Sequence, residues 1–161
     1  GLAAVTVRRS RHFGMASYYA LMCLEHDMIG CSMTNNSGVG VIPTFGGEPM
    51  LSTNPISVVA PTRHEPPFEM DFATSVAAMS KIGLAKATGT KIPLGWALAD
   101  QGQPTEDPHA AWDARSLLPL GGTRELGSHK GYGLAVLVDI LTGVLGGRTI
   151  PWLGLRTTAG R

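Results

Sequence analysis

The residue best suited to acid–base chemistry is His12, which stands between Arg11 and Phe13 and is followed by Gly14. A histidine side chain changes charge near neutral pH, so it can take the proton of a substrate hydroxyl while a hydride leaves the neighbouring carbon. A loop histidine that makes only a structural hydrogen bond is the simpler alternative. The residues alone leave both interpretations open.

Two further segments could hold an anion. Thr74 and Ser75 are residue types that often precede a helix, and the backbone N–H groups at a helix start attract phosphate. Lys130 lies between Gly127 and Gly131 at the start of an apolar helical pattern, where it could supply positive charge to a pyrophosphate. Ordinary helix capping and a solvated lysine are the alternatives for these two segments.

Several familiar site patterns are absent from the sequence. The Gly38-x-Gly40 and Gly131-x-Gly133 pairs lack the third glycine of the Rossmann fingerprint. The phosphate-binding loop of nucleotide hydrolases and the serine-hydrolase elbow are also missing. The histidines are dispersed rather than paired, so we expect no metal site. They are His12, His26, His64, His109 and His129.

Composition favours one soluble globular domain. The chain has 161 residues, of which 43% are hydrophobic and 16% are charged, and its formal charge is +1. Nucleic acid is therefore not an expected partner, because its binders usually carry a surplus of positive charge. The longest apolar stretch, residues 132–145, is shorter than the roughly 20 residues of a membrane-spanning helix. Cys23 and Cys31 lack a disulfide or redox spacing, so we expect reduced thiols in a cytoplasmic protein.

The hydrophobic pattern predicts strands that alternate with helices, which is typical of a mixed α/β (α+β) layer structure. Strands are expected at residues 2–7, 29–34, 56–60 and 68–72, and helices at residues 15–28, from 75 or 76 to 86, and at 132–145.

The sequence makes more specific predictions for the first helix, for residues 89–122 and for the last helix. The first helix should bury its apolar residues and end at Gly30. These residues are Met15, Tyr18, Tyr19, Met22 and Cys23. Residues 89–122 are rich in proline and should form a long irregular loop. The last helix is apolar on nearly every side and should be buried between other elements.

Taken in order, the motifs of the chain resemble those of one dehydrogenase family. They include Ser10-x-His12-Phe13-Gly14, Thr34-Asn35, Gly46-Gly47, Thr53-Asn54-Pro55-Ile56, Asp71-x-Ala73-Thr74-Ser75, Lys81, Pro93-x-Gly95-Trp96-Ala97, Pro104-Thr105-x-Asp107-Pro108, Pro119-Leu120-Gly121-Gly122 and Lys130-Gly131-Tyr132-Gly133-Leu134. On these motifs the chain resembles the malate/L-lactate dehydrogenase family, which is unrelated in fold to the Rossmann-type enzymes. That family also includes ureidoglycolate, sulfolactate and piperideine-2-carboxylate oxidoreductases.

The resemblance implies an oxidoreductase that uses NAD or NADP and a small 2-hydroxy or 2-oxo acid. It implies a non-Rossmann cofactor domain at residues 1–147, with a sheet packed with helices, in a homodimer whose active site lies between domains. The histidine that matches His12 is the proton acceptor in such enzymes. Thr74, Ser75 and Lys130 would help to hold the phosphates. Other matching positions contact the dinucleotide, namely Asn36, Met70, Asp71, Phe72, Ala73 and Leu120, with Thr74 and Ser75.

The chain also departs from the family pattern. Family members begin with a further helical region that carries another histidine and a substrate-binding arginine, so we expect this chain to be a fragment with an incomplete substrate site. Residues 148–161 form an atypical tail with three arginines and no acidic residue. The alternative function is a catalytically silent remnant that only binds nucleotide or dimerises. An enzyme of unrelated chemistry, which binds no nicotinamide, is a third hypothesis.

Overall fold

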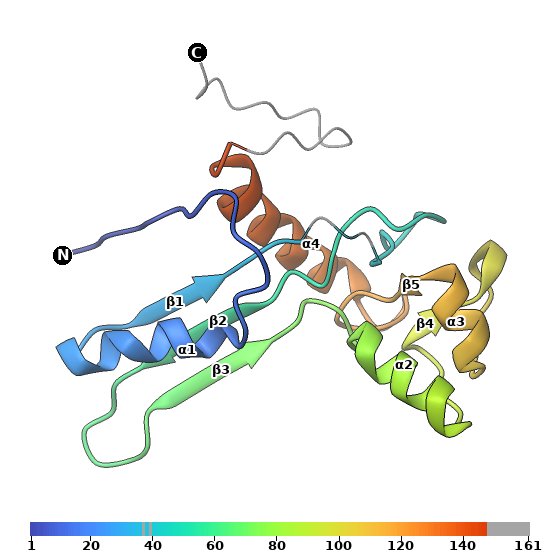
Figure 1. The fold of residues 1–161 in the computed structure, drawn as a ribbon, viewed down its shortest axis with the longest axis horizontal. Helices are drawn as coiled ribbons and strands as arrows, with labels where there is room; N and C mark the ends of the chain where they lie inside the picture. Colours follow the sequence, from blue (N-terminus) through green and yellow to red (C-terminus); the bar gives the residue numbers. More distant parts are fainter. Residues whose placement is uncertain (37, 39, 148–161) are drawn as a thin grey trace. The chain divides into compact units, whose positions relative to one another are not determined.

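The computed structural model describes residues 1–36, 38 and 40–147, which fall into two compact units (Figure 1). Unit 1 holds residues 1–35, 55–72 and the chain from residue 137, and unit 2 holds residues 36–54 and 73–136. Each combines helices with a small antiparallel sheet, which confirms the predicted mixed α/β class. The predicted tail at residues 148–161 lies outside the described residues. The assignment of residues 1–147 to a cofactor domain stays a prediction.

The sheet of unit 1 contains three antiparallel strands in the order β1-β2-β3. They are β1 at Gly30–Met33, β2 at Ile56–Ala60 and β3 at Phe68–Phe72. Val59 pairs with Gly30 on one side, and Ser57 pairs with Asp71 on the other. These three strands confirm the sequence prediction, because β-branched and aromatic residues bounded by turn residues are a reliable strand pattern.

The strand predicted at residues 2–7 is wrong. Leu2 is 100% exposed and Val5 is 88% exposed. No strand among the described residues pairs with this segment. Because a strand needs a neighbour for its backbone N–H and C=O groups, a suitable side-chain pattern does not form one by itself.

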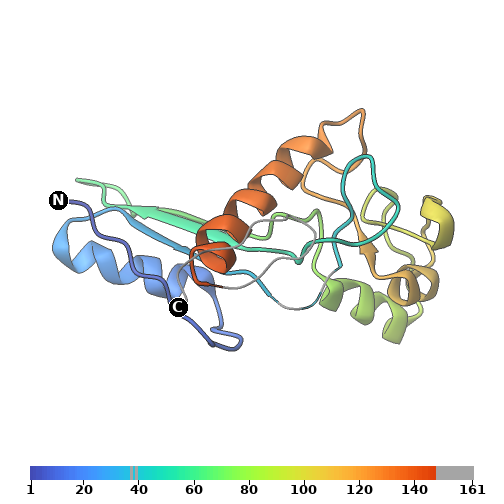
Figure 2. The same cartoon turned by 90° about the horizontal axis from the view of Figure 1, so that it is seen from above.

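Helix α1, at Ala16–Leu21, lies along one face of this sheet (Figure 2) and continues into a 3-10 turn at Met22–His26. The helix confirms the prediction, but the predicted buried face is wrong. Small residues are buried instead, namely Ala16, Ser17 and Ala20. The predicted core residues Met15, Tyr18, Tyr19 and Met22 are exposed, with 43% to 62% of each side chain accessible.

The cause of this inversion is the short distance between α1 and β1. A Cβ atom at Gly30 would overlap the backbone of Ala20, so the helix backbone rests directly on the strand. Only small side chains fit into such a contact. Gly30 is therefore not the helix stop that the sequence predicted. The 3-10 turn ends at Asp27, whose φ of 54° is left-handed and whose N–H donates to Cys23 and Leu24 carbonyls.

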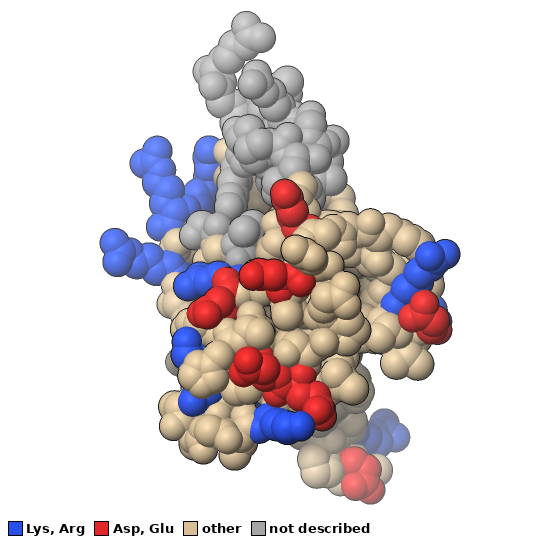
Figure 3. Space-filling view, turned by 90° about the vertical axis from the view of Figure 1, so that its right-hand side faces the viewer, with Lys and Arg blue, Asp and Glu red and all other residues tan. Residues whose placement is uncertain are grey.

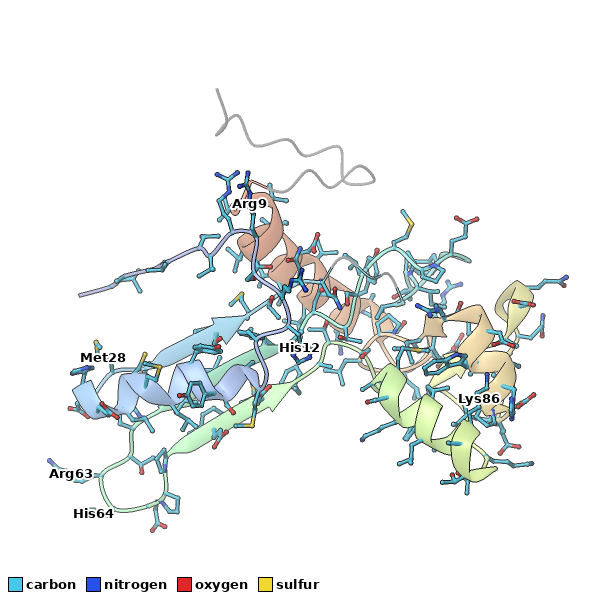
Figure 4. All side chains as sticks on the ribbon, viewed as in Figure 1. Arg9, His12, Met28, Arg63, His64 and Lys86 are labelled. Carbon is cyan, nitrogen blue, oxygen red and sulfur yellow. The ribbon has the colours of Figure 1, made fainter. Side chains whose placement is uncertain are left out.

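Besides most of the last helix, unit 2 contains two helices and a two-stranded sheet. The helices are α2 at Met79–Thr88 and α3 at Pro108–Ala114, and the strands are β4 at Ala97–Leu98 and β5 at Ser116–Leu117, with a 3-10 turn at Asp100–Gly102. The two helices pack closely where Gly83 faces Trp112, since a Cβ at Gly83 would come within 2.8 Å of the indole. The Lys86 ammonium, labelled in Figure 4, lies 5.7 Å from the centre of the Trp112 ring.

Two predictions in unit 2 are wrong. Helix α2 begins at Met79 rather than at residue 75 or 76, because the backbone there pairs with another segment: Val76 N–H donates to Leu118 O. Residues 89–122 are not one irregular loop, since they include α3. Its start carries two standard signals, an Asp107 side chain that accepts the His109 N–H and a proline at the first helical position.

Helix α4, at Ser128–Asp139, continues into a π-helical turn at Ile140–Val144 and carries the chain from unit 2 into unit 1. This confirms the predicted last helix, although its predicted burial on nearly every side is wrong. Ala135 and Val138 are fully buried, but leucines at four-residue spacing are exposed: Leu137, Leu141 and Leu145. No helix among the described residues has both the length and the apolarity to cross a membrane.

The contact between α1 and β1 predicts the effect of adding one methyl group. We expect Gly30→Ala to lower the free energy of unfolding by about 1–3 kcal/mol, because the new Cβ must push α1 away from the strand. Gly133→Ala is the matched control, since nothing lies within 4 Å of a Cβ at that helical position. It should stabilise the protein by about 0.5–1 kcal/mol. Urea unfolding measures both changes, and an equal response at the two sites would contradict the close packing.

Candidate functional site

His12 lies in the loop that leads into α1, and its side chain is exposed (Figure 4). The Gly14 N–H donates a hydrogen bond of 3.1 Å to His12 Nδ1. Gly14 has a φ of 85°, a left-handed conformation that glycine adopts without strain. Because Nδ1 accepts, the neutral ring carries its proton on Nε2, and this N–H can donate to an oxygen atom beyond the loop.

The first turn of α1 is anchored to the sheet through Asp71. Ser17 N–H donates to Asp71 Oδ2 at 2.7 Å. The N-cap residue, Met15, provides no side-chain acceptor for the free N–H groups of the first turn. The Asp71 carboxylate on the neighbouring strand accepts one of these N–H groups instead, and its negative charge interacts favourably with the helix dipole. Asp71 was predicted as a cofactor residue. The structure gives it a definite local role at the helix that follows the His12 loop.

The neighbours of Asp71 on β3 face the other way. Side chains alternate along a strand, so Met70 and Phe72 lie on the sheet face opposite to α1. Both are partly exposed. Their predicted contact with a dinucleotide stays a prediction, and so does that of Ala73, the first residue of unit 2 after β3.

The predicted helix-capping role of Thr74 and Ser75 is wrong. The N-cap of α2 is Ala78, and the two hydroxyls bind carbonyl groups instead. Thr74 is fully buried and its hydroxyl lies 3.0 Å and 3.1 Å from the carbonyl oxygens of Thr53 and Asn54. Ser75 is 4% exposed and donates to Ala77 O at 2.7 Å. These hydroxyls stabilise the local backbone, and their predicted contact with phosphate stays a prediction.

Unit 2 brings three of the predicted cofactor residues together. Leu120 N–H donates to Thr74 O at 2.9 Å. A Cβ at Gly131 would overlap the backbone of Leu120, so the first turn of α4 rests directly on that residue. Lys130, which precedes Gly131, is exposed in the same turn. Leu120 therefore lies against both Thr74 and the first turn of α4, the turn that carries Lys130.

The charges near this turn have both signs. A backbone hydrogen bond and the Thr123 hydroxyl lower the pKa of the Glu125 carboxyl, so this loop carries a negative charge close in sequence to Lys130. Arg124 lies 4.7 Å above the ring of Phe45. On the face drawn in Figure 3, acidic and basic side chains both occur and neither sign covers the surface. Among the described residues, no three His, Cys, Asp or Glu side chains form a cluster suited to a metal ion.

Unit 2 also contains two asparagines whose side chains make hydrogen bonds, Asn36 and Asn54. Asn36 Oδ1 accepts the Gly38 N–H at 3.3 Å, and its predicted dinucleotide contact stays a prediction. Sequence reasoning gave no side-chain role to Asn54, which is fully buried and donates from Nδ2 to Ala135 O at 2.9 Å. Among the described residues, its Oδ1 has no hydrogen-bond partner. The Asn54-Pro55 dipeptide, used only as a turn signal, was the available clue.

The predicted residues thus fall into two groups. His12, Met70, Asp71 and Phe72 belong to unit 1, whereas Asn36, Ala73, Thr74, Ser75, Leu120 and Lys130 belong to unit 2. The convergence of the two groups on one pocket stays a prediction.

Comparisons with known proteins agree on one family. The model of the family described as malate/L-lactate dehydrogenase matches residues 1–157. The malate dehydrogenase of Pyrococcus abyssi is 49% identical over 150 residues, which are 92% of this chain and 41% of that enzyme. The malate/(S)-sulfolactate dehydrogenase of Methanothermus fervidus is 40% identical over 145 residues, 90% of this chain and 40% of that enzyme.

A solved structure gives the same result. The crystal structure of malate dehydrogenase from Entamoeba histolytica matches with a TM-score of 0.81 and 35% sequence identity, over 89% of this chain and 41% of that chain. The chain thus spans about two fifths of the length of these relatives. From the extent of the family match and the shared fold, the chain belongs to the malate/L-lactate dehydrogenase family.

Proposed function

We propose that the chain forms part of an NAD(P)-dependent oxidoreductase that acts on small 2-hydroxy acids. One observation carries the proposal: an exposed imidazole is held on a glycine turn in a chain that is 49% identical to a malate dehydrogenase. The proposal includes the partners that the resemblance implies, which are a small acid and a second subunit rather than nucleic acid or membrane. It also includes a cytoplasmic location.

In the oxidation direction, the hydroxyl of the substrate loses a proton and its carbon loses a hydride. The nicotinamide, when bound, accepts the hydride. We assign the proton to Nε2 of His12. To accept it there, the neutral ring must carry its own proton on Nδ1, so the hydrogen bond from Gly14 has to open. In the reverse direction, the imidazolium formed by this step donates its Nε2 proton to the 2-oxo oxygen as the hydride reaches the carbon, and the neutral ring is restored.

The start of α4 supports a place for the dinucleotide phosphates. The positive end of the helix dipole lies there, and Lys130 adds a full positive charge. Direct packing of Gly131 on Leu120 fixes the backbone beside it. These features suit an anionic dinucleotide, and they do not separate NAD from NADP.

The names of the relatives suggest that the substrate carries a second acidic group. The two relatives described above are named for malate and sulfolactate. Both compounds are 2-hydroxy acids with a second acidic group, whereas lactate has none. We therefore propose a 2-hydroxy acid with two acidic groups. A catalytically silent protein that only binds nucleotide or dimerises is the second candidate.

Binding and turnover separate these two candidates. We expect NADH or NADPH fluorescence to change on titration with the purified chain, and the protein in its natural length to oxidise malate faster than lactate. Dinucleotide binding without turnover of any 2-hydroxy acid would favour the remnant. Absence of nicotinamide binding would contradict the oxidoreductase and leave a remnant that only dimerises or an enzyme of unrelated chemistry.

Replacement of His12 tests the proton-transfer role. His12→Ala should lower kcat by about 10²–10⁴-fold, the usual contribution of a positioned acid–base group, while the dissociation constant of the dinucleotide changes by no more than a few-fold. His64→Ala is the control, because His64 is exposed on the turn between β2 and β3 (Figure 4). Unchanged turnover in His12→Ala would remove the role.

Replacement of Lys130 tests the phosphate site. Lys130→Gln should weaken dinucleotide binding by about tenfold, through loss of a charge-assisted hydrogen bond, and should reduce the dependence of affinity on salt. Lys91→Gln serves as the control, since Lys91 is 78% exposed and pairs with Glu106 at 3.0 Å. Equal effects of the two variants would show that only the net charge of the protein matters.

A further inference from the structure

We propose that Tyr19 is a positioning residue that holds the His12 imidazole through the peptide group between Phe13 and Gly14. The kinetic part of this inference rests on the proposed function of His12. The structural part concerns hydrogen bonds alone and can be tested without any turnover.

Tyr19 contacts Phe13 in two ways. Its hydroxyl donates to the Phe13 carbonyl oxygen at 3.2 Å. Its ring also stacks on the Phe13 ring, with the centroids 5.2 Å apart and the planes 7° from parallel. Two contacts on opposite sides of one residue fix both its backbone and its side chain.

The carbonyl that Tyr19 binds belongs to the same peptide group as the N–H that His12 binds. The Phe13 C=O and the Gly14 N–H are the two polar ends of one planar amide. Tyr19 donates to the oxygen, and the N–H donates to His12 Nδ1. Because the amide is rigid, holding the oxygen sets the direction of the N–H. The tyrosine hydroxyl also polarises the amide, which strengthens the bond to the imidazole.

The other end of this chain of contacts is anchored in the sheet. Tyr19 is on α1, and α1 is held by the Asp71 carboxylate at Ser17 and by the contact of Ala20 with Gly30. The Tyr19 side chain is 43% exposed, so core burial does not explain its place. The neighbouring Tyr18 is 62% exposed and meets Tyr19 edge to face at 5.3 Å. Tyr18 therefore provides a control of the same residue type on the same helix.

The direct test is the tautomer of His12, read from side-chain 15N chemical shifts at a pH at which the ring is neutral. The His12 signals are assigned by their loss in His12→Ala. The unaltered chain should show the proton on Nε2. Tyr19→Leu, which removes both contacts, should change the ratio of the two tautomers by about two- to tenfold, the net worth of one hydrogen bond.

Two conservative variants complete the series. Tyr19→Phe keeps the ring contact and should give an intermediate ratio, and Tyr18→Phe should leave the ratio as it is. Far-UV circular dichroism verifies that each variant is folded. If Tyr19→Leu misfolds, the tautomer ratio of His12 in Tyr19→Phe alone tests the inference. A ratio that is the same in every folded Tyr19 variant as in the unaltered chain would overturn the inference.

Kinetics then test the consequence for the proposed function. In the protein that turns over, Tyr19→Leu weakens the Gly14 hydrogen bond that has to open before Nε2 accepts a proton, so it should raise kcat for oxidation by about two- to tenfold and leave dinucleotide affinity within twofold. Tyr19→Phe should give part of this increase. If no 2-hydroxy acid is oxidised, the proposed function fails, while the tautomer ratio still decides the role of Tyr19.

Discussion

The direct contact of α1 with β1 is the constraint on which the His12 region depends. Gly30 lets the backbone of Ala20 rest on the strand, and this contact decides which face of α1 is buried. Small residues line the contact, so the tyrosines and methionines point away from the sheet. Tyr19 is thereby placed to bind Phe13, and the loop with His12 and Gly14 takes its shape from that contact. A glycine in a strand thus determines the surroundings of an imidazole far from it in sequence.

The sequence predicted most of the regular structure of the chain but not its packing. Three strands, the two longer helices and the mixed α/β class follow from local pattern, because β-branched runs and apolar periodicity report on the backbone directly. The errors arise where a partner elsewhere in the chain decides the outcome. No strand in the described part of the chain pairs with residues 2–7. Val76 pairs with Leu118 instead of starting a helix, and Gly30 allows a close contact with α1 instead of ending that helix. Helix α3 was missed for a different reason, because its start signals, Asp107 and Pro108, are local and could have been recognised in the sequence.

The candidate site shows the same division. The motifs indicated the family and His12 as a candidate, but they could not show which hydroxyl groups are exposed and able to bind a ligand. Thr74 and Ser75 are buried donors to carbonyl groups: Thr74 binds Thr53, which is distant in sequence, whereas Ser75 binds Ala77 in the same turn. Leu120 and Lys130, in contrast, meet at the start of α4 because Gly131 allows direct backbone contact. In both candidate regions, a glycine at a close approach sets the packing around the polar residues: Gly30 beside α1 and Gly131 beside Leu120.

The proposed function requires His12 to lie beside the nicotinamide, where it can take the proton of a 2-hydroxy acid whose hydride is transferred to the cofactor. The most direct measurement is a nuclear Overhauser effect between the imidazole protons of His12 and the C4 protons of NADH or NADPH at saturating concentration. The proposed function predicts this effect at His12 and its loss in His12→Ala. A saturated complex whose nicotinamide protons show nuclear Overhauser effects only to other side chains would contradict the proposed function of His12.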